Sequence, residues 1–274
     1  MPELPEVETI KRDLQANILN CTMEDVFVFD QRILKNITLT DFIIRLKGAE
    51  IKSITRKSKA IVIELNTGFY LIIQLGMTGH MILSREFNKE NILRETKLVF
   101  MLSQGMYLYY NDHRLFGKWH LVKDLEDVHY IRTSGPDPFN GTFSPQWLTE
   151  SLKGKKAPIK NLLMNQTFIG GIGNIYASEI LFASRIHPQK KGGRLTSNNR
   201  KILYHAIQDV LKEAIEYRGT SLRNYRVTSG EKGEFINRIK VYGRENEPCV
   251  ICGASIKRIV QAGRSTFFCG KCQK

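Results

Sequence analysis

Four of the five cysteines form two closely spaced pairs near the end of the chain. Cys249 and Cys252 make one Cys-x-x-Cys pair, Cys269 and Cys272 make the other, and 16 residues separate the two pairs. This spacing is typical of a four-cysteine zinc site, in which two tight turns each offer two thiolates to a tetrahedral ion. Four thiolates leave no open position on the metal, so we expect one structural Zn²⁺, with unmetallated thiols as the alternative.

The residues between the two pairs predict a β-hairpin. Lys257–Gln261 and Ser265–Phe268 flank Ala262-Gly263-Arg264, which places the tip at Gly263. The guanidinium of Arg264 could bind a pair of phosphate oxygens. A solvated turn arginine explains this residue equally well from the sequence alone.

A glycine-rich turn provides a second candidate for phosphate binding. Gly170-Gly171-Ile172-Gly173-Asn174 precedes a predicted helix over 175–184, so backbone N–H groups and the Asn174 amide could hold a phosphate there. The segment 159–166 reads as a helix, which argues against a dinucleotide fingerprint. A plain turn between helices, with Asn174 as the N-cap, is the simpler interpretation.

The charge of the chain favours a polyanionic partner. The 274 residues contain 41 Lys and Arg against 27 Asp and Glu, a net charge of +14. Neutralising phosphates releases condensed counterions, although a generally basic protein would show the same excess. The acidic N-terminus does not match a secretory signal, and the most apolar stretch, 69–77, is too short for a membrane helix. Together with the paired cysteines, these features predict a cytoplasmic protein without a membrane partner.

Hydrophobic periodicity predicts an α+β chain of two domains. A helix is expected over 3–17, and strand-like runs follow at 51–54, 60–65, 69–75, 97–102 and 106–110. After the breaker cluster Ser134–Pro138, the clearest helix covers 197–218 and stops at Gly219. We expect an N-terminal two-sheet β-sandwich over 1–134, a linker over 135–150, a helical domain over 151–240 and a zinc finger over 241–274.

Three motifs resemble the formamidopyrimidine-DNA glycosylase family, the bifunctional 8-oxoguanine DNA glycosylases and AP lyases. They are the opening Pro2-Glu3-Leu4-Pro5-Glu6-Val7-Glu8-Thr9, the turn Gly171-Ile172-Gly173-Asn174-Ile175-Tyr176 with Glu179, and the ending Ala262-Gly263-Arg264-Ser265-Thr266-x-Phe268-Cys269. They lie at both ends and in the middle of the chain, in the right order, so the resemblance covers essentially the whole chain. The resemblance implies a helix–two-turns–helix domain, and a monomer that binds damaged double-stranded DNA in the bacterial cytoplasm and so associates with the nucleoid.

The resemblance also implies the catalytic residues. Pro2, freed by removal of Met1, is the nucleophile, and Glu3 is the general acid–base at the sugar. Lys59 matches a strand lysine that assists at the reacting sugar and its phosphate, and Arg264 belongs to the same site. Taken alone, Glu3 would be a helix-dipole partner and Lys59 a solvated lysine.

The remaining expected roles concern DNA binding. By the same resemblance, Met77 and Phe116 enter the base stack and Arg114 pairs with the orphaned cytosine; read without it, these are a core methionine and an ordinary strand–turn segment. We assign Lys160, Asn174 and Arg264 to DNA binding as well. Leu115 departs from the family, which commonly has a basic residue there, so one phosphate contact is in doubt.

Two other functions stay open at this point. The related endonuclease VIII type acts on oxidised pyrimidines, but it typically carries glycine where this chain has Leu4. The segment 221–238 also resembles the lesion-capping loop of the purine enzymes. A non-catalytic zinc-ribbon DNA-binding protein is the second alternative, and the set of Pro2, Glu3 and Lys59 argues against it.

Overall fold

The computed structural model describes residues 2–87, 92, 94–220, 228 and 233–274. The chain splits into two compact units, each considered by itself: Met1–Arg132 with Tyr217–Ile236, and Thr133–Glu216 with Asn237–Lys274. Within the described ranges, no helix is both long enough and apolar enough to cross a membrane.

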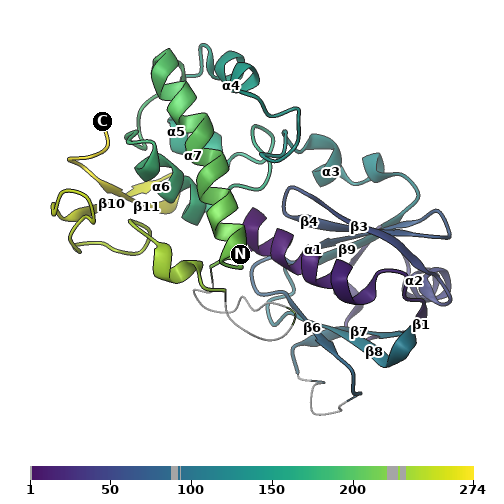
Figure 1. The fold of residues 1–274 in the computed structure, drawn as a ribbon. Helices are drawn as coiled ribbons and strands as arrows, with labels where there is room; N and C mark the ends of the chain where they lie inside the picture. Colours follow the sequence, from purple (N-terminus) through teal and green to yellow (C-terminus); the bar gives the residue numbers. More distant parts are fainter. Residues whose placement is uncertain (1, 88–91, 93, 221–227, 229–232) are drawn as a thin grey trace. The chain divides into compact units, whose positions relative to one another are not determined.

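The first unit combines one long helix with two β-sheets, drawn in purple to teal in Figure 1. One sheet has four antiparallel strands in the order β1-β7-β8-β6, and the other has five strands in the order β2-β9-β5-β4-β3. The elements are α1 (Leu4–Ile18), β1 (Met23–Val28), β2 (Leu34–Lys35), α2 (Leu39–Leu46), β3 (Ile51–Lys57), β4 (Ala60–Leu65), β5 (Tyr70–Gln74), β6 (His80–Ser84), β7 (Thr96–Leu102), β8 (Met106–Asn111), β9 (Lys118–Val122) and α3 (His129–Thr133).

A single hydrophobic core joins both sheets and α1. The apolar stripe of the helix, Val7, Ile10 and Leu14, is fully buried against residues of both sheets. This arrangement confirms the predicted helix and the two sheets, because the stripe needs a large apolar surface to cover it. The chain turns between β4 and β5 at Gly68, which has φ +78°.

The second unit is helical and ends in a β-hairpin. Its helices are α4 (Pro145–Leu152), α5 (Ile159–Met164), α6 (Asn174–Ala183) and α7 (Ser197–Glu216). Gly219, three residues beyond the last residue of α7, has φ +78°, which agrees with the expected stop of the long helix. Strands β10 (Ile256–Gln261) and β11 (Arg264–Cys269) form the predicted hairpin around a two-residue turn. Arg264 is thus the first residue of β11, beside the turn.

Candidate functional site

The start of α1 is fixed by the carboxylate of Glu6. One oxygen of Glu6 accepts a hydrogen bond from the backbone N–H of Glu3 at 2.7 Å, and the other accepts from the N–H of Thr220 at 2.7 Å. Pro2, Glu3 and Glu6 are all buried. The two expected catalytic residues at the N-terminus therefore begin a helix whose first turn is held in one orientation.

Lys59 lies in the tight turn between β3 and β4, and not on a strand as the family resemblance implied. Lys57 pairs with Ala60, so Ser58 and Lys59 are the two turn residues. Ser58 has φ +56°, a left-handed conformation that the turn requires and that glycine usually adopts. Lys59 is only 8% exposed, so the turn brings its side chain into the protein instead of into solvent.

A buried ion pair connects α1 to this turn. The Glu8 carboxylate on α1 accepts from Nε of Arg56 on β3 at 2.9 Å, and Nη1 of Arg56 donates to the carbonyl of Ser58 at 2.9 Å. Burial alone would raise the pKa of Glu8, but the neighbouring cations, Arg56 first among them, lower it below its ordinary value. Helix α1, whose N-cap is Glu3, and the turn that carries Lys59 are thereby linked by charge-assisted hydrogen bonds.

The structure brings together Met77 and Phe116, the two residues expected to enter the base stack, and Arg114, which is expected to pair with the orphaned cytosine. Arg114 lies 4.4 Å from the ring centroid of Phe116, and its Nη1 approaches the sulfur of Met77 at 3.8 Å. Met77 is 44% exposed and Phe116 is 47% exposed, which is unusual for large apolar side chains. Because the loops of Met77 and Phe116 meet here, an apolar pair is presented at the surface beside a guanidinium.

The Asp112 carboxylate organises both of these loops. It is fully buried and accepts from the hydroxyl of Thr78, from the N–H groups of Arg114 at 3.2 Å and Gly117 at 2.8 Å, and from the hydroxyl of Tyr110 at 3.2 Å. Four donors therefore converge on one side chain that sequence reasoning did not single out. Its position before the Arg114 loop was a visible signal, since aspartate commonly accepts from backbone N–H groups two residues on.

The two loops also approach each other closely through a glycine. A Cβ added to Gly76, at φ +68°, would lie 2.5 Å from the carbonyl carbon of Phe116, so no side chain fits there. Leu115 adopts φ +55° and packs against the hydrophobic core. The residue that replaces the basic side chain of the family is therefore partly buried.

In the second unit, Lys160 and Asn174 act together on the zinc hairpin. Lys160 is 1% exposed, and its ammonium donates to Oδ1 of Asn174 at 2.6 Å, to the Ser265 carbonyl at 3.1 Å and to Oγ1 of Thr266 at 2.7 Å. The Asn174 amide donates to the same Ser265 carbonyl at 3.1 Å. Gly173, and not Asn174, is the N-cap of α6. These bonds fix the backbone next to Arg264, which is exposed. Contact of Lys160 and Asn174 with DNA stays a prediction.

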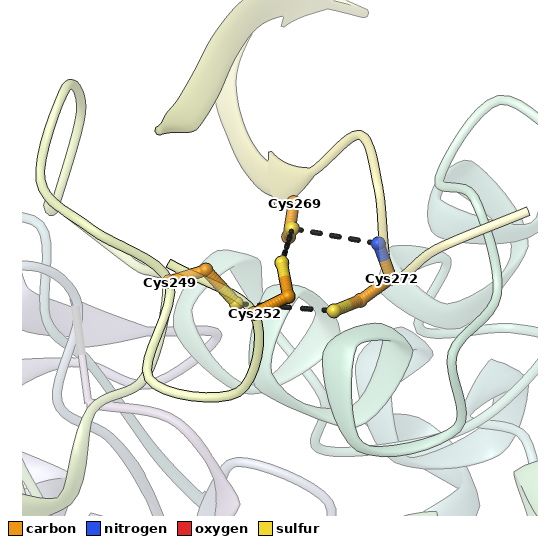
Figure 2. Close-up of side chains that lie close together, drawn as sticks. All are labelled: Cys249, Cys252, Cys269 and Cys272. Carbon is orange, nitrogen blue, oxygen red and sulfur yellow. Dashed lines mark hydrogen bonds between the residues drawn. The ribbon is translucent and has the colours of Figure 1, made fainter. Parts of the chain in front are cut away.

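The four cysteines of the expected zinc site point toward one another (Figure 2). The sulfurs of Cys249 and Cys272 are 3.9 Å apart, those of Cys252 and Cys269 are 3.5 Å apart, and all four lie within 4.8 Å of one another. A tetrahedral Zn²⁺ with Zn–S bonds of about 2.3 Å needs sulfurs separated by roughly 3.8 Å. The donor set and its spacing therefore fit one structural zinc ion.

Glu179 joins α6 to the segment that leads into this zinc cluster. Its carboxylate accepts from the backbone N–H groups of Lys240, Val241 and Tyr242 at 2.8 to 3.0 Å. Burial raises the pKa of Glu179, and the three N–H donors oppose that shift. The glutamate in the motif is thus a structural acceptor within this unit.

Three family models match the chain in succession. They are the formamidopyrimidine-DNA glycosylase N-terminal domain over residues 1–119, the H2TH domain of the same enzymes over 134–226, and a zinc finger found in FPG and IleRS over 246–274. Together they place the α1 start, the loops of Met77 and Arg114, the Asn174 turn and the cysteines in domains of one family.

Curated relatives agree over the full length. A formamidopyrimidine-DNA glycosylase of Chloroflexus aurantiacus is 39% identical over 273 residues, which cover 100% of this chain and 98% of the relative. One from Desulforamulus reducens is 36% identical over 278 residues, which cover 100% of this chain and 99% of the relative.

Solved structures are similar as well. The MutM (FPG) protein of Thermus thermophilus has a TM-score of 0.89 at 36% identity and covers 99% of this chain and 98% of its own. A Lactococcus lactis FPG in complex with DNA that contains an abasic site has a TM-score of 0.91 at 32% identity, with 99% of each chain covered. The match is thus complete in domains, length and fold, and the chain belongs to the formamidopyrimidine-DNA glycosylase family.

Proposed function

We propose that this protein is a base-excision repair enzyme that removes oxidised purines from damaged double-stranded DNA and then cleaves the strand. Similar proteins from Lactococcus lactis were crystallised with DNA that contains Fapy-dG or an abasic site, which supports a DNA lesion as the substrate. The carrying observation is the connection of the Glu3 helix start to the Lys59 turn through Glu8 and Arg56.

The nucleophile is the α-amine of Pro2 after removal of Met1. An α-amine has a pKa near 7.7–8.0, so roughly a third is unprotonated at pH 7.5, whereas an ordinary lysine near 10.4 is about 0.1% free. The proline α-amine is a secondary amine and therefore somewhat more basic. Its unprotonated fraction at pH 7.5 still exceeds that of an ordinary lysine. The amine lone pair forms a bond to C1′ of the sugar, and the damaged base departs with the electrons of the glycosidic bond. The attacking nitrogen then releases its N–H proton, which leaves with the base, and so recovers a lone pair.

Opening of the sugar ring is the step assigned to Glu3. As the C1′–O4′ bond breaks, Glu3 donates a proton to O4′, and the nitrogen lone pair forms an iminium with C1′. The iminium withdraws electrons and so makes the protons on C2′ more acidic. Loss of a C2′ proton expels the 3′ phosphate by β-elimination, and δ-elimination then expels the 5′ phosphate. Lys59 assists at the reacting sugar and its phosphate.

DNA contacts are divided between the two units. Met77 and Phe116 fill the space left by the extruded nucleotide, and Arg114 pairs with the opposite cytosine. Arg264, with Lys160 and Asn174 behind it, binds backbone phosphate. Zinc bound by the four cysteines supplies no chemistry at the sugar, but it closes a small module that has too few apolar residues to hold Arg264 in place alone.

We assign catalysis to residues 1–134, the linker to 135–150, DNA binding to the helical domain over 151–240 and the zinc finger to 241–274. Within the third segment, residues 217–236 belong to the compact unit of residues 1–132. The lesion-capping segment expected over 221–238 falls largely outside the described residues. We place the enzyme, as a monomer, in the bacterial cytoplasm, where it associates with the nucleoid through DNA.

Borohydride trapping tests this proposal directly. The protein is incubated with a duplex that contains 8-oxoguanine opposite cytosine, and reduction should join it covalently to the DNA through Pro2. A parallel duplex with an oxidised pyrimidine tests the endonuclease VIII alternative, which predicts the stronger trapping there. Binding to both duplexes without any trapping would instead support a non-catalytic DNA-binding protein.

A further inference from the structure

The turn that carries Lys59 is held by a tyrosine from a distant helix. The hydroxyl of Tyr130, on α3, lies 2.9 Å from Oγ of Ser58 and accepts a hydrogen bond from the backbone N–H of Lys59 at 3.1 Å. One side chain thus contacts both residues of the turn.

This turn needs such support because of its conformation. Ser58 is 1% exposed and adopts φ +56°, a region that costs an L-residue roughly 1–2 kcal/mol. Glycine would occupy the position without that cost. The serine hydroxyl, which glycine lacks, is the group that Tyr130 meets.

Two side chains from different elements therefore hold the turn, one from β3 and one from α3. Arg56 donates to the carbonyl of Ser58, while Tyr130 bonds to the Ser58 hydroxyl and the Lys59 N–H. The ring of Tyr130 is itself held, since it packs against a buried cluster on one side of the five-stranded sheet, formed by Ala60, Val62, Ile72, Val122, Val128 and Ile131.

We propose that Tyr130 is a positioning residue for Lys59, and that its hydroxyl sets the orientation in which the lysine side chain leaves the turn. The inference rests on the proposed function, which places Lys59 at the reacting sugar. Displacement of a catalytic group by about 1 Å can cost on the order of 10²-fold in rate. Hydrogen bonds from Tyr130 to Ser58 and to the Lys59 N–H should therefore affect the rate of turnover more than the affinity for DNA.

Tyr130→Phe removes only the hydroxyl and keeps the ring in its cluster. Tyr70→Phe is the matched control, because Tyr70 packs against the same cluster and the structure gives its hydroxyl no hydrogen bond within the described residues. Single-turnover rates of base release and strand nicking are measured at saturating enzyme, together with the half-saturating enzyme concentration. Tyr130→Phe should lower the rates roughly five- to thirtyfold, with half-saturation within about twofold of wild type.

A double-mutant cycle separates positioning from a structural role. In a Lys59→Met background, Tyr130→Phe should cause no further loss, because the group that it positions is gone. Ser58→Ala, which removes the other partner of the same hydrogen bond, should give a smaller loss that is not additive with Tyr130→Phe. This variant also keeps the proposal testable if Tyr130→Phe folds poorly.

Three results would overturn the inference. The first is a fall in single-turnover rate in Tyr130→Phe that is no larger than the fall in Tyr70→Phe. The second is an undiminished fall in rate when Tyr130→Phe is added to Lys59→Met, and the third is a change in the half-saturating enzyme concentration with unchanged rates. Wild-type rates in Lys59→Met would remove the roles of Lys59 and Tyr130 together. Failure of the wild-type protein to release any base would instead refute the proposed function itself.

Discussion

Replacing Asp112 with asparagine should destabilise the loops that carry Met77 and Arg114 without changing either of those residues. The Asp112 carboxylate is fully buried, and each of its oxygens accepts one hydroxyl and one backbone N–H. Asparagine has the same shape, but one oxygen becomes an NH₂ group that cannot accept. The Tyr110 or Thr78 hydroxyl can rotate to accept from it, whereas a backbone N–H cannot.

The magnitude follows from that geometry. In either orientation of the amide, one backbone N–H faces a donor and loses its partner: the part-buried N–H of Arg114 or the buried N–H of Gly117. An unsatisfied buried donor costs about 1–3 kcal/mol, and bonds to a charged acceptor contribute about 1.5–3 kcal/mol each. We expect Asp112→Asn to lower the free energy of unfolding by about 2–4 kcal/mol. With a urea m-value of about 2 kcal/mol/M, the midpoint should fall by roughly 1–2 M.

Tryptophan fluorescence can report on this unit alone. The chain has two tryptophans, and Trp119 is fully buried in the first unit with its ring 5.0 Å from that of Tyr110. In a Trp147→Phe background, urea unfolding followed at Trp119 therefore reports the region around Asp112. Base excision measured on the same proteins should fall with the Asp112→Asn substitution.

Asp124→Asn is the matched control. Asp124 caps a short 3₁₀ helix at the surface by accepting from the N–H of Glu126 at 2.9 Å, and asparagine caps equally well. Its urea midpoint should stay within about 0.3 M of wild type, because asparagine preserves the cap. A wild-type midpoint and wild-type excision in Asp112→Asn would refute the idea that the four converging donors fix these loops.

Three further predictions concern the chemistry, the zinc finger and pH. Glu3→Gln should lose 8-oxoguanine excision by about 10²- to 10⁴-fold but retain most nicking of a preformed abasic site, and equal losses on the two matched duplexes would contradict its role in ring opening. Cys269→Ser should lose zinc by metal analysis and weaken binding to lesion and undamaged DNA alike, whereas Arg264→Ala should keep zinc and reduce the salt slope by about one unit; an unchanged slope would exclude a phosphate contact. Because the pKa of Glu8 is lowered in the folded protein, its stabilising effect is present above its ordinary value of 4.5 and lost as pH falls through the lower folded value. Glu8→Gln should therefore be less stable at pH 7 and lose less stability in acid, and parallel acid unfolding curves would contradict the pairing with Arg56.

Local patterns predicted much of the fold because they act over short distances. The strand-like apolar run over 60–65 predicted β4 at its observed bounds, and the cysteine spacing predicted the cluster in the second unit. Helix α2 was not assigned, although Thr38 caps it and Phe42 and Leu46 lie on its buried side. That signal was present but short, since the helix has only eight residues.

The site depended on contacts that no local pattern carries. The sequence suggested Asn174 as a helix cap. Instead its amide oxygen accepts from Lys160, and its amide nitrogen donates to the carbonyl of Ser265, 91 residues further along. Tyr130 meets Ser58 across a separation of 72 residues. Such pairs form only when separate elements pack together. In a single sequence, neither partner can be distinguished from an ordinary polar residue. The roles of Pro2 and Lys59 came from family resemblance alone.

The hydrogen bonds of Glu6 have a consequence for the order in which the protein is made. Its carboxylate holds the start of α1 and also the N–H of Thr220, which lies 214 residues later in the chain. Residues 217–236 complete the same compact unit as residues 1–132. On the ribosome, the first turn of the protein therefore emerges long before its partner and waits for most of the chain to be synthesised. Met1 can be removed from the nascent N-terminus during that interval, while the contact between Glu6 and Thr220, beside the proposed nucleophile Pro2, forms only after Thr220 has emerged.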